Sequence, residues 1–582
     1  MCGIIGILGE NVSQHQLERM IEVQQHRGPD ANGVYVSPDR KIGLAHNRLS
    51  IIDLSEAGRQ PMFSGDGNYI LVFNGEIYNY KELYAYFPNY PFKSQSDSEV
   101  LLAAYEKWGE KCVDYFIGMF SFAIWDNKNK LLFCARDRFG VKPFYYTFDQ
   151  ANNFLFASEI KTLHQANVKK EFNPSTWATY FSYGLYDHGE NTFWNGIKSL
   201  KGGHQLIWKD GEVTIKKWYS LEKRITEGYD ERPFDEIKKE YLSILLESIK
   251  FRFRADVPVG INLSGGLDSS ILLGLVDQYK GIDNEIIAFT FATGDERYDE
   301  LFWAKNMLAH TKHPHEICYL SAKEVPDLAM EIQETEDEPF GGFPTLAYSR
   351  IFQRAKEKGI TVLLDGQGMD EQWAGYEYYK KHLVNGEMEK QATGPVQASK
   401  SSPFRRNCLL PEFRNLAQSL EVPSVFSDSL RNMQYRDTFI SKIPRALRFN
   451  DRISMRYGTE LREPFLDHRL FELAFQQKPS LKIQGDVQKW LLRKLADDLL
   501  PRKVSEAPKR PLQTPQREWL KDELRDWVYD SINNLLNTHG GIWFDRKSIL
   551  SEWNAYLKEP IDNSFFIWQW LSLSMISKIN DQ

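Results

Sequence analysis

Residues 258–270 read PVGINLSGGLDSS, an apolar strand followed by a glycine-rich loop that opens a helix. The paired glycines let the backbone approach a ligand closely, and successive backbone N–H groups at a helix start bind anions. Around this stretch, helix-like segments alternate with short apolar strands, which predicts a parallel sheet with helices on both faces. The expected helices span 234–253, 269–278, 298–312 and 344–358, and the expected strands span 258–263, 286–291 and 361–364.

A second polar motif follows the third of these strands, where residues 364–371 read LDGQGMDE. Asp268 and Asp370 are then expected near the carboxyl ends of parallel strands. Paired carboxylates of this kind hold Mg²⁺ that also binds phosphates. An acidic turn with a helix cap is the alternative interpretation of this segment. With the glycine-rich loop upstream, the sequence favours a metal site at Asp268 and Asp370.

The chain begins Met1-Cys2-Gly3. Removal of Met1 would leave Cys2 with both a thiol and a free α-amino group, so one residue would carry a nucleophile and its base. A chance Met-Cys start is the alternative. The first 215 or so residues contain short apolar strands between turn signals, and Asp210-Gly211 predicts a hairpin over 205–216. These features predict an α+β domain with antiparallel sheets.

Polar residues behind Cys2 suit acyl transfer from an amino-acid amide through a thioester. The Asn74 side chain and the Gly75 N–H can form an oxyanion hole. Arg48 can pair with a substrate carboxylate, and Glu76 with Asp97 can bind its ammonium group. Each of these residues taken singly is better interpreted as part of a surface turn. Their order behind Cys2 favours the functional interpretation.

Composition excludes several classes of protein. A chain of 582 residues is too long for one core, so two or more domains are expected. A net charge of −7 argues against nonspecific binding to nucleic acid or to anionic membranes. The five cysteines are scattered, which indicates neither disulfides nor a zinc site. With no signal peptide and no membrane-length apolar stretch, we expect a cytoplasmic protein without a membrane partner.

The loop at 264–269 resembles that of ATP pyrophosphatases, which cleave ATP to AMP and pyrophosphate. Nearly the whole chain resembles the glutamine-hydrolysing asparagine synthetases. This implies a class II glutamine amidotransferase domain over 2–215, with the four-layer α/β/β/α sandwich of Ntn hydrolases. It also implies a synthetase domain of the PP-loop ATP pyrophosphatase type over 230–582, with an irregular insertion around 385–440. The motifs that carry the resemblance are Cys2–Ile4, His26–Asp30, Arg48–Asp53, Asn74–Asn79, Asp97, Ser264–Ser269, Gly366–Glu371, Arg462–Asp467 and Lys489–Arg493.

The resemblance implies a role for each motif. Cys2 would form a glutamyl thioester, and ammonia would pass through an internal tunnel to a carboxylate adenylated by ATP with Mg²⁺. Lys489, otherwise an ordinary solvated helix lysine, would stabilise phosphate charge; a homodimer is a further expectation. The implied catalytic residues are Cys2, Asn74, Gly75 and Lys489. The implied glutamine-binding residues are Arg48, Leu49, Ser50, Ile51, Ile52, Asn74, Gly75, Glu76 and Asp97. The implied ATP-binding residues are Leu263, Ser264, Gly265, Gly266, Asp268, Ser269, Phe291, Asp365 and Gly366, and Gln367 is implied at the acceptor and adenylate site.

Two departures from the family bear on the acceptor. Gln367 stands where typical members carry a glutamate tied to forming the aspartyl adenylate. The loop at 336–345 lacks the threonine and arginine that some members place near aspartate, although Arg350, Arg354 or Arg462 can supply a cation from elsewhere. The main hypothesis is amidation of aspartate to asparagine, and the alternative is amidation of another carboxylate, such as a sugar uronate in surface-polysaccharide synthesis. A non-catalytic relative and a ring-closing synthetase are less favoured, because Cys2 and the glutaminase residues are intact.

Overall fold

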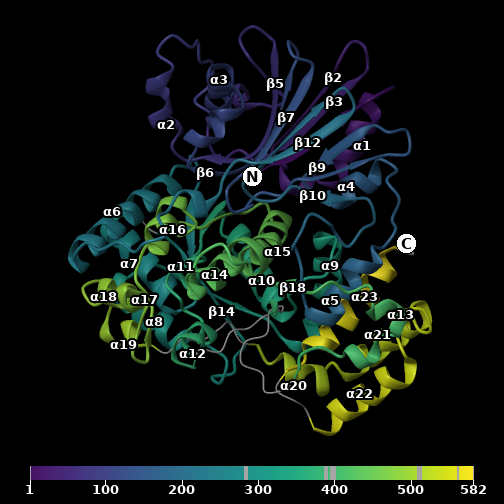
Figure 1. Cartoon of the computed structure of the whole chain (residues 1–582), viewed down its shortest axis with the longest axis vertical. Helices are drawn as coiled ribbons and strands as arrows, with labels where there is room; N and C mark the ends of the chain where they lie inside the picture. The colour runs from purple at the N-terminus through teal and green to yellow at the C-terminus, as the bar shows by residue number, and fades with distance from the viewer. Residues whose placement is uncertain are drawn as a thin grey trace.

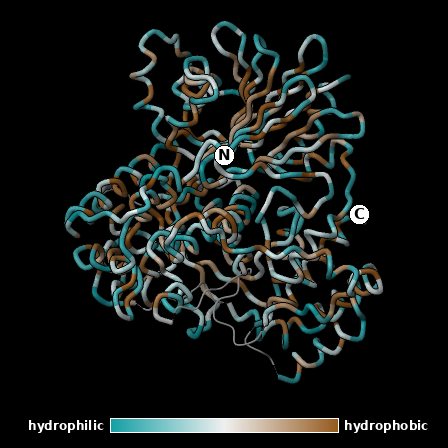
Figure 2. The backbone as a smooth tube through the Cα atoms, viewed as in Figure 1, coloured by the Kyte–Doolittle hydropathy of each residue, from teal (hydrophilic) through white to brown (hydrophobic). Residues whose placement is uncertain are grey.

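The computed structural model describes residues 2–280, 286–385, 391–392, 402–507, 514–559 and 563–580. Figure 1 shows two parts, a strand-rich upper part from the beginning of the chain and a larger lower part in which helices surround a sheet. No helix among the described residues is long and apolar enough to cross a membrane. The hydrophobic segments run along the strands inside the upper part, and its outer loops are hydrophilic (Figure 2).

The upper part is built on two six-stranded antiparallel sheets. Residues along β1 alternate between two cores: Ile4 and Leu8 pack between the sheets, and Ile5 and Ile7 pack beneath α1. Helices α1 (Gln14–Val23) and α4 (Ile160–Gln165) cover the first sheet, and α3 (Asp97–Trp108) covers the second. The predicted four-layer α/β/β/α sandwich is confirmed.

The first sheet has the order β10 (Lys198–Ser199), β8 (Tyr145–Phe148), β9 (Phe154–Ala157), β1 (Gly3–Leu8), β3 (Ile42–Arg48) and β2 (Ala31–Val36). The second has the order β12 (Glu212–Lys217), β11 (His204–Lys209), β7 (Leu131–Arg136), β6 (Gly118–Asp126), β5 (Tyr69–Ile77) and β4 (Met62–Phe63).

The lower part contains a five-stranded parallel sheet, as the alternating pattern predicts. Ile261 and Leu364 face one layer of helices, whereas Phe289 and Leu363 face the opposite layer. The strand order is β15 (His315–Tyr319), β14 (Ala288–Ala292), β13 (Val259–Asn262), β16 (Val362–Leu364) and β19 (Glu460–Arg462). One face carries α6 (Phe234–Arg252), α7 (Leu267–Lys280), α8 (Leu301–Thr311), α16 (His468–Phe475) and α18 (Trp490–Ala496), and the other carries α9 (Val325–Glu336), α10 (Phe343–Glu357) and α15 (Lys442–Arg456).

One group of the remaining helices, which includes α13 (Pro411–Arg414) and α23 (Phe565–Asn580), also contains a segment from early in the chain. Helix α5 (Pro174–Tyr183), although it belongs to the first 215 residues, packs against α13 and α23 of the lower part. Of the predicted insertion at 385–440, the described residues are 385, 391–392 and 402–440, which contain β17, α13, β18 and α14, and the rest of the insertion lies outside the described residues. The other elements are α2 (Tyr80–Leu83), α11 (Met369–Gln372), α12 (Glu377–Asn385), β17 (Gln391–Ala392), α13 (Pro411–Arg414), β18 (Leu420–Glu421), α14 (Ser429–Arg436), α17 (Pro479–Lys482), β20 (Ile483–Gln484), β21 (Val487–Gln488), α19 (Arg502–Ser505), α20 (Gln516–Lys521), α21 (Arg525–Thr538), α22 (Arg546–Lys558) and α23 (Phe565–Asn580).

Candidate active sites

Cys2 lies buried at the start of β1, beside the middle of β5 in the facing sheet. Its backbone N–H donates to Asn74 Oδ1 at 3.1 Å. The other end of that amide, Asn74 Nδ2, is buried without a hydrogen-bond acceptor among the described residues, so it can donate to a developing oxyanion. Burial raises the pKa of the Cys2 thiol, so the thiol needs a base when it attacks.

Gly75 follows Asn74 at a position that only glycine can occupy. Its φ is +150°, and a Cβ there would lie 2.1 Å from the carbonyl oxygen of Met119 on β6. The absence of a side chain therefore keeps β5 paired with β6 while the strand passes close to Cys2. This geometry fits the predicted use of the Gly75 N–H next to the nucleophile.

A small cavity opens beside Cys2, and most of the predicted glutamine-binding residues line it. The exceptions are Asn74, which contacts Cys2 directly, and Ser50, whose N–H instead donates to Asp30 Oδ2 at 2.7 Å. Sequence reasoning missed Gln60 and Ser98, which are joined by a 3.2 Å hydrogen bond. The predicted residues in the lining are Cys2, Arg48, Leu49, Ile51, Ile52, Gly75, Glu76 and Asp97, and the unpredicted ones are Gly58, Gln60, Phe73, Ser96 and Ser98.

The charged residues of this cavity are held in place by their surroundings. The Arg48 guanidinium donates to the carbonyl oxygens of Ser55, at 2.7 Å, and Asp53. Gly58 leaves the space for it, since a Cβ there would lie 2.3 Å from Arg48 Nη2. Asp97, at the start of α3, accepts the N–H of Ile77 at 2.8 Å, and burial raises its pKa to about 7.

The glycine-rich loop of the lower part connects β13 to α7, as predicted. Gly265 has φ +86° and passes so close to α8 that a Cβ would lie 2.9 Å from both Ala304 N and Glu300 O. Ser264 Oγ lies 3.0 Å from Ser269 Oγ and accepts the N–H of Gly266 at 3.2 Å. The loop therefore folds into a turn whose N–H groups precede a 14-residue helix, the arrangement of a phosphate cradle.

Lys489 joins the two predicted metal-binding carboxylates. Its Nζ lies 2.7 and 2.6 Å from the two carboxylate oxygens of Asp268 and 2.5 Å from Asp370 Oδ1. Burial opposes the charge on Lys489, yet the two carboxylates raise its pKa overall. Gly375 leaves space for the group, because a Cβ there would lie 1.9 Å from Asp370 Oδ1. A cavity of about 550 Å³ adjoins Lys489, Asp268 and the glycine-rich loop.

The remaining predicted nucleotide residues lie at the ends of β14 and β16. Asp365 is buried, accepts the Asn262 side chain at 3.1 Å, and burial raises its pKa to about 6. Gly366 packs closely against the backbone of Ser269: a Cβ on residue 366 would lie only 3.2 Å from the Ser269 nitrogen. The Gln367 side chain lies near the Tyr348 hydroxyl on α10, where it acts against the rise that burial causes in the pKa of Tyr348. The Phe291 side chain belongs to the apolar core.

None of the three arginines considered for the acceptor lies beside Gln367. Arg350 pairs with Glu324, and Arg354 pairs with Glu316, both on the outer side of α10. Arg462 points away from the nucleotide and reaches Glu76, with 3.4 Å between Nη2 and Oε1.

The chain matches two family models in succession. Residues 1–219 match a glutamine amidotransferase domain, and residues 240–578 match the asparagine synthase model. The chain belongs to the asparagine synthase family. It is an ATP-dependent ligase of the glutamine-hydrolysing type.

Relatives in the family align with the chain from end to end. Asparagine synthetase [glutamine-hydrolyzing] 1 of Bacillus subtilis (strain 168) is 28% identical, over 100% of this chain and 97% of its own length. Asparagine synthetase [glutamine-hydrolyzing] 3 of the same strain is 31% identical, over 93% and 94%. A solved glutamine phosphoribosylpyrophosphate amidotransferase from B. subtilis, complexed with ADP and GMP, is 15% identical over 54% of this chain and 65% of that chain, with a TM-score of 0.29.

In this asparagine synthase family member, the loop at 336–345 joins the two parts of the molecule. Asp337 accepts the N–H groups of Ile160 and Lys161 at 2.9 and 3.2 Å, and Glu338 accepts the N–H of Phe193 at 2.8 Å. Its acidic residues are therefore occupied by contacts with the amidotransferase part. The acidic groups of this loop take cations from two places: Glu336 pairs with Arg448 of α15 at 3.2 Å, and Asp337 pairs with Lys161 of the amidotransferase part at 3.1 Å.

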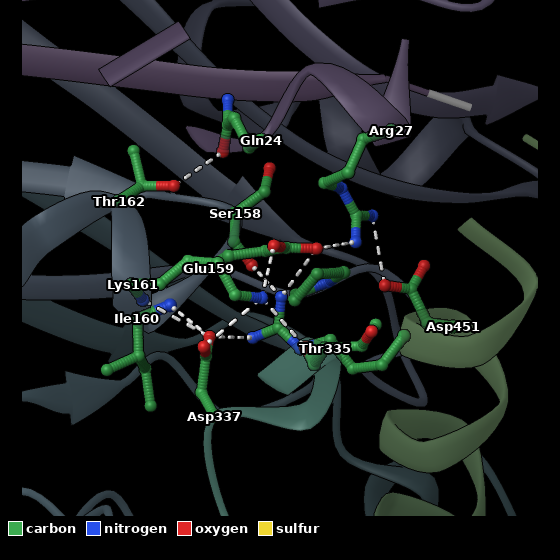
Figure 3. Close-up of polar contacts among 12 residues, drawn as sticks. Gln24, Arg27, Ser158, Glu159, Ile160, Lys161, Thr162, Thr335, Asp337 and Asp451 are labelled. Carbon is green, nitrogen blue, oxygen red and sulfur yellow. Dashed lines mark hydrogen bonds and ion pairs between the residues drawn. The ribbon is translucent and has the colours of Figure 1, made fainter. Parts of the chain in front are cut away.

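Helix α15 carries a row of cations that sequence reasoning missed, although the spacing of 442, 445, 448, 452 and 456 is helical. Arg448 pairs with Asp187 at 2.9 Å and Glu336 at 3.2 Å, and Arg452 pairs with Glu159 at 3.1 Å. Figure 3 shows Glu159 and Asp337 at the centre of these contacts, with Arg27 between Glu159 and Asp451. Arg27 also donates to the carbonyl oxygen of Cys2 at 3.1 Å, so this network reaches the nucleophile.

Lys442 is the first cation of the same row. It lies near the acidic pair Asp370-Glu371 that ends the motif at 364–371. Its Nζ lies 3.7 Å from the centroid of the Tyr376 ring, and the Tyr376 hydroxyl donates to Glu371 at 2.6 Å. Burial lowers the pKa of Lys442 and raises that of Glu371. A cation and an acid beside Asp370 are suited to hold a small ligand that carries both charges.

Proposed function

We propose that this enzyme transfers the side-chain nitrogen of glutamine to aspartate, giving asparagine and glutamate, with cleavage of ATP to AMP and pyrophosphate. The observation that carries the proposal is the small cavity beside Cys2, which Gly75, Arg48 and Asp97 line and beside which Asn74 contacts Cys2. These residues supply a nucleophile, an oxyanion hole, a cation for the substrate carboxylate and an anion for its ammonium group.

In the first half-reaction, the α-amine of a processed Cys2 takes the thiol proton as sulfur attacks the glutamine amide carbon. Asn74 Nδ2 and the Gly75 N–H stabilise the oxyanion of the tetrahedral intermediate. Collapse of the intermediate breaks the C–N bond, and the proton passes to the leaving ammonia. Water then hydrolyses the thioester, releasing glutamate and restoring the thiol.

In the second half-reaction, the acceptor carboxylate attacks the α-phosphorus of ATP and pyrophosphate leaves. Ammonia then attacks the acyl-adenylate carbon, and AMP leaves as the amide forms. The turn at 264–269 supports binding of phosphates through its N–H groups. Lys489 is poised to neutralise charge that develops on them.

Mg²⁺ would bind between Asp268 and Asp370. Both carboxylates already share the Lys489 cation, which supports a site for positive charge between them. No set of three or more metal-binding side chains occurs in the part of the chain that the structure describes, so the ion would complete its shell with phosphates and water. The ion would supply further neutralisation of the phosphates.

The two half-reactions can be tested separately. A diazoketone analogue of glutamine should alkylate Cys2, and mass spectrometry should locate the adduct on that residue. With ammonia in place of glutamine, aspartate should stimulate pyrophosphate release, and EDTA should stop that release without slowing glutamine hydrolysis. Lys489→Met should lower ammonia-driven turnover by about 10²-fold or more while sparing the adduct. An unreactive Cys2 would contradict the first half, and pyrophosphate release without dependence on aspartate would contradict the acceptor.

A second acceptor class is supported by the environment of Gln367. The neutral Gln367–Tyr348 pair stands where a charged glutamate is typical, and Arg350, Arg354 and Arg462 are all engaged elsewhere. A neutral amide and a phenol suit hydroxyl groups, so a sugar uronate is the alternative acceptor. Pyrophosphate release measured across aspartate, simple hydroxy acids and uronates distinguishes the two. Replacing Gln367 by Glu should raise the preference for aspartate if the uronate is the natural acceptor.

A further inference from the structure

Arg462 belongs to the synthetase part of the chain, and its side chain reaches Glu76, a residue in the wall of the glutamine cavity. It ends β19, the edge strand of the parallel sheet, and its side chain is fully buried. Nε lies 2.5 Å from Glu460 Oε1, and Nη2 lies 3.4 Å from Glu76 Oε1. Glu76 is one of the residues that line the cavity beside Cys2. One guanidinium thus joins the two halves of the enzyme.

The same guanidinium organises the segment that supports the glutamine-binding loop. Arg462 Nη1 donates to the carbonyl oxygens of Arg252 and Arg254, each at 2.8 Å. Two residues further on, Asp256 accepts the N–H of Asp53 at 2.9 Å and donates its own N–H to Ile51 O at 2.8 Å. The segment at 252–256 therefore accepts hydrogen bonds from Arg462 and is itself hydrogen-bonded to Ile51 and Asp53, next to the cavity wall.

Arg462 also touches the nucleotide side of the enzyme. Its carbonyl oxygen accepts the N–H of Asp365 at 2.9 Å, next to the predicted ATP-binding Gly366. The backbone of one residue therefore contacts the predicted adenylation site, while its side chain contacts Glu76 in the wall of the glutamine cavity.

Charge at the glutamine cavity depends on this arginine. Glu76, Asp97 and Glu460 are three buried carboxylates, and Arg462 is the cation that approaches Glu76 within the described part of the chain. Burial raises the pKa of both Glu76 and Asp97, and Arg462 acts against that rise in each case. A protonated acid does not attract an ammonium group, so the glutamine clamp needs a nearby cation to stay ionised.

We propose that Arg462 is a positioning residue of the glutamine cavity, supplied by the synthetase domain, so that the cavity is complete only while the two domains are docked. It aligns Glu76 and the loop at 51–53 to receive the α-ammonium group of glutamine. The proposal rests on the proposed glutaminase function, because it assigns how that site is assembled.

The test compares Arg462→Gln and Arg462→Lys in the full chain, with Arg456→Gln as the matched control. Arg456 lies six residues earlier on α15 and pairs with Glu331 away from both sites. In Arg462→Gln, the KM for glutamine should rise about tenfold or more, with kcat changed much less. Arg462→Lys should recover part of the loss by restoring the charge, and Arg456→Gln should match the parent chain.

The pH dependence of the KM for glutamine distinguishes the proposal from a merely structural role, because a structural role of Arg462 would leave that dependence unchanged. Glu76 is faced by Asp97 from α3, by Glu460 and Arg462 from β19, and by the amino-terminal charge. Without Arg462 the carboxylates hold their protons to higher pH, so the rise in KM on acidification should begin at higher pH in Arg462→Gln. The parent, Arg456→Gln and Arg462→Lys chains should share a lower onset.

Three results would overturn the proposal. One is a KM for glutamine that is unchanged or lower in Arg462→Gln. Another is an equal loss of glutamine-driven and ammonia-driven turnover together with a lower melting temperature, which would indicate only a structural role. The third is an unchanged pH profile. Absence of glutaminase activity in the parent chain would instead contradict the proposed function, and the two failures are therefore distinguishable.

Discussion

At the scale of single residues, Asn74 has two ends with two tasks. Oδ1 is used by the N–H of Cys2, and Nδ2 is left to donate to the substrate. We expect Asn74→Ala to lower kcat for glutamine hydrolysis by about 10²–10³-fold with a smaller effect on KM, because the lost donor acts in the transition state. A stopped-time glutamate assay measures this, and ammonia-driven turnover of the same variant is the control. A rise in KM with unchanged kcat would show that Asn74 only binds ground-state glutamine.

If Asp97 binds the ammonium group of glutamine as proposed, we expect glutamine binding to depend on pH near neutrality. Burial raises its pKa to about 7, so the carboxylate gains a proton as the pH falls through 7 and loses its attraction for the substrate ammonium. We therefore expect KM for glutamine to rise steadily from pH 8 to pH 6 as this charge disappears. Asp97→Asn should have a high KM at every pH, with less dependence on pH. A parallel slope in the two proteins would assign the titration to another group.

Many site residues could be predicted because their chemistry is visible in the sequence. Cys2, Asn74, Glu76 and Asp97 belong to a cavity that the structure forms beside the nucleophile. Gln60, in a loop, and Ser98, in the first turn of α3, could not be predicted, because a neutral side chain carries no signal until folding brings it to the cavity.

At the scale of elements, the close approach of the glycine-rich loop to α8 gives Gly265 a measurable role. Gly265→Ala would place a Cβ 2.9 Å from backbone atoms of residues 300 and 304, which cannot move without shifting the helix. We expect a loss of stability of about 1–3 kcal/mol and a raised KM for ATP. Gly359→Ala is the matched control, since Gly359 has φ +72° but nothing within 4 Å of its Cβ. Urea unfolding measures the loss of stability, and pyrophosphate release measures the KM for ATP. Equal changes in Gly265→Ala and Gly359→Ala would show that the positive φ, and not the contact with α8, causes them.

Elements with strong local signals were predicted closely. The expected helices at 234–253 and 344–358 are α6 and α10, and the hairpin at Asp210-Gly211 joins β11 to β12. Strands β15 and β19 were not predicted, because polar residues interrupt their apolar pattern: β15 begins with His315 and Glu316, and β19 consists of Glu460, Leu461 and Arg462. Such strands form because neighbouring strands offer hydrogen bonds, which a local pattern does not reveal.

At the scale of the whole molecule, the contact between the two parts depends on α15. Arg448 is buried, pairs with Asp187 and Glu336, and donates to the carbonyl oxygen of Pro339 at 2.6 Å. Arg448→Met would leave the Glu336 carboxylate buried without its closest cation, so we expect a loss of about 3–5 kcal/mol in unfolding free energy. Arg456→Met, at an exposed pair on the same helix, should cost about 1 kcal/mol or less.

Urea unfolding of the two arginine variants provides the measurement, and the ratio of glutamine-driven to ammonia-driven turnover provides the second readout. That ratio should fall in Arg448→Met, since a loosened interface separates the source of ammonia from its consumer. Equal stability of the two variants would contradict a structural role for this interface.

The sequence by itself determined the family of this protein and the order of its two folds. These features depend on residues that are close together in the sequence, so they can be recognised without the structure. They are the glycine turns, the helix starts, the alternating strands and the nucleophile near the amino terminus. Only the tertiary structure decided that Arg462 faces Glu76 rather than an acceptor, and that the loop at 336–345 meets α15 and the amidotransferase domain. The physical reason is that a buried ion pair between distant segments depends on how two cores dock. In the unfolded chain water solvates each charged side chain, so the sequence does not reveal which partner the charge will pair with once it is buried.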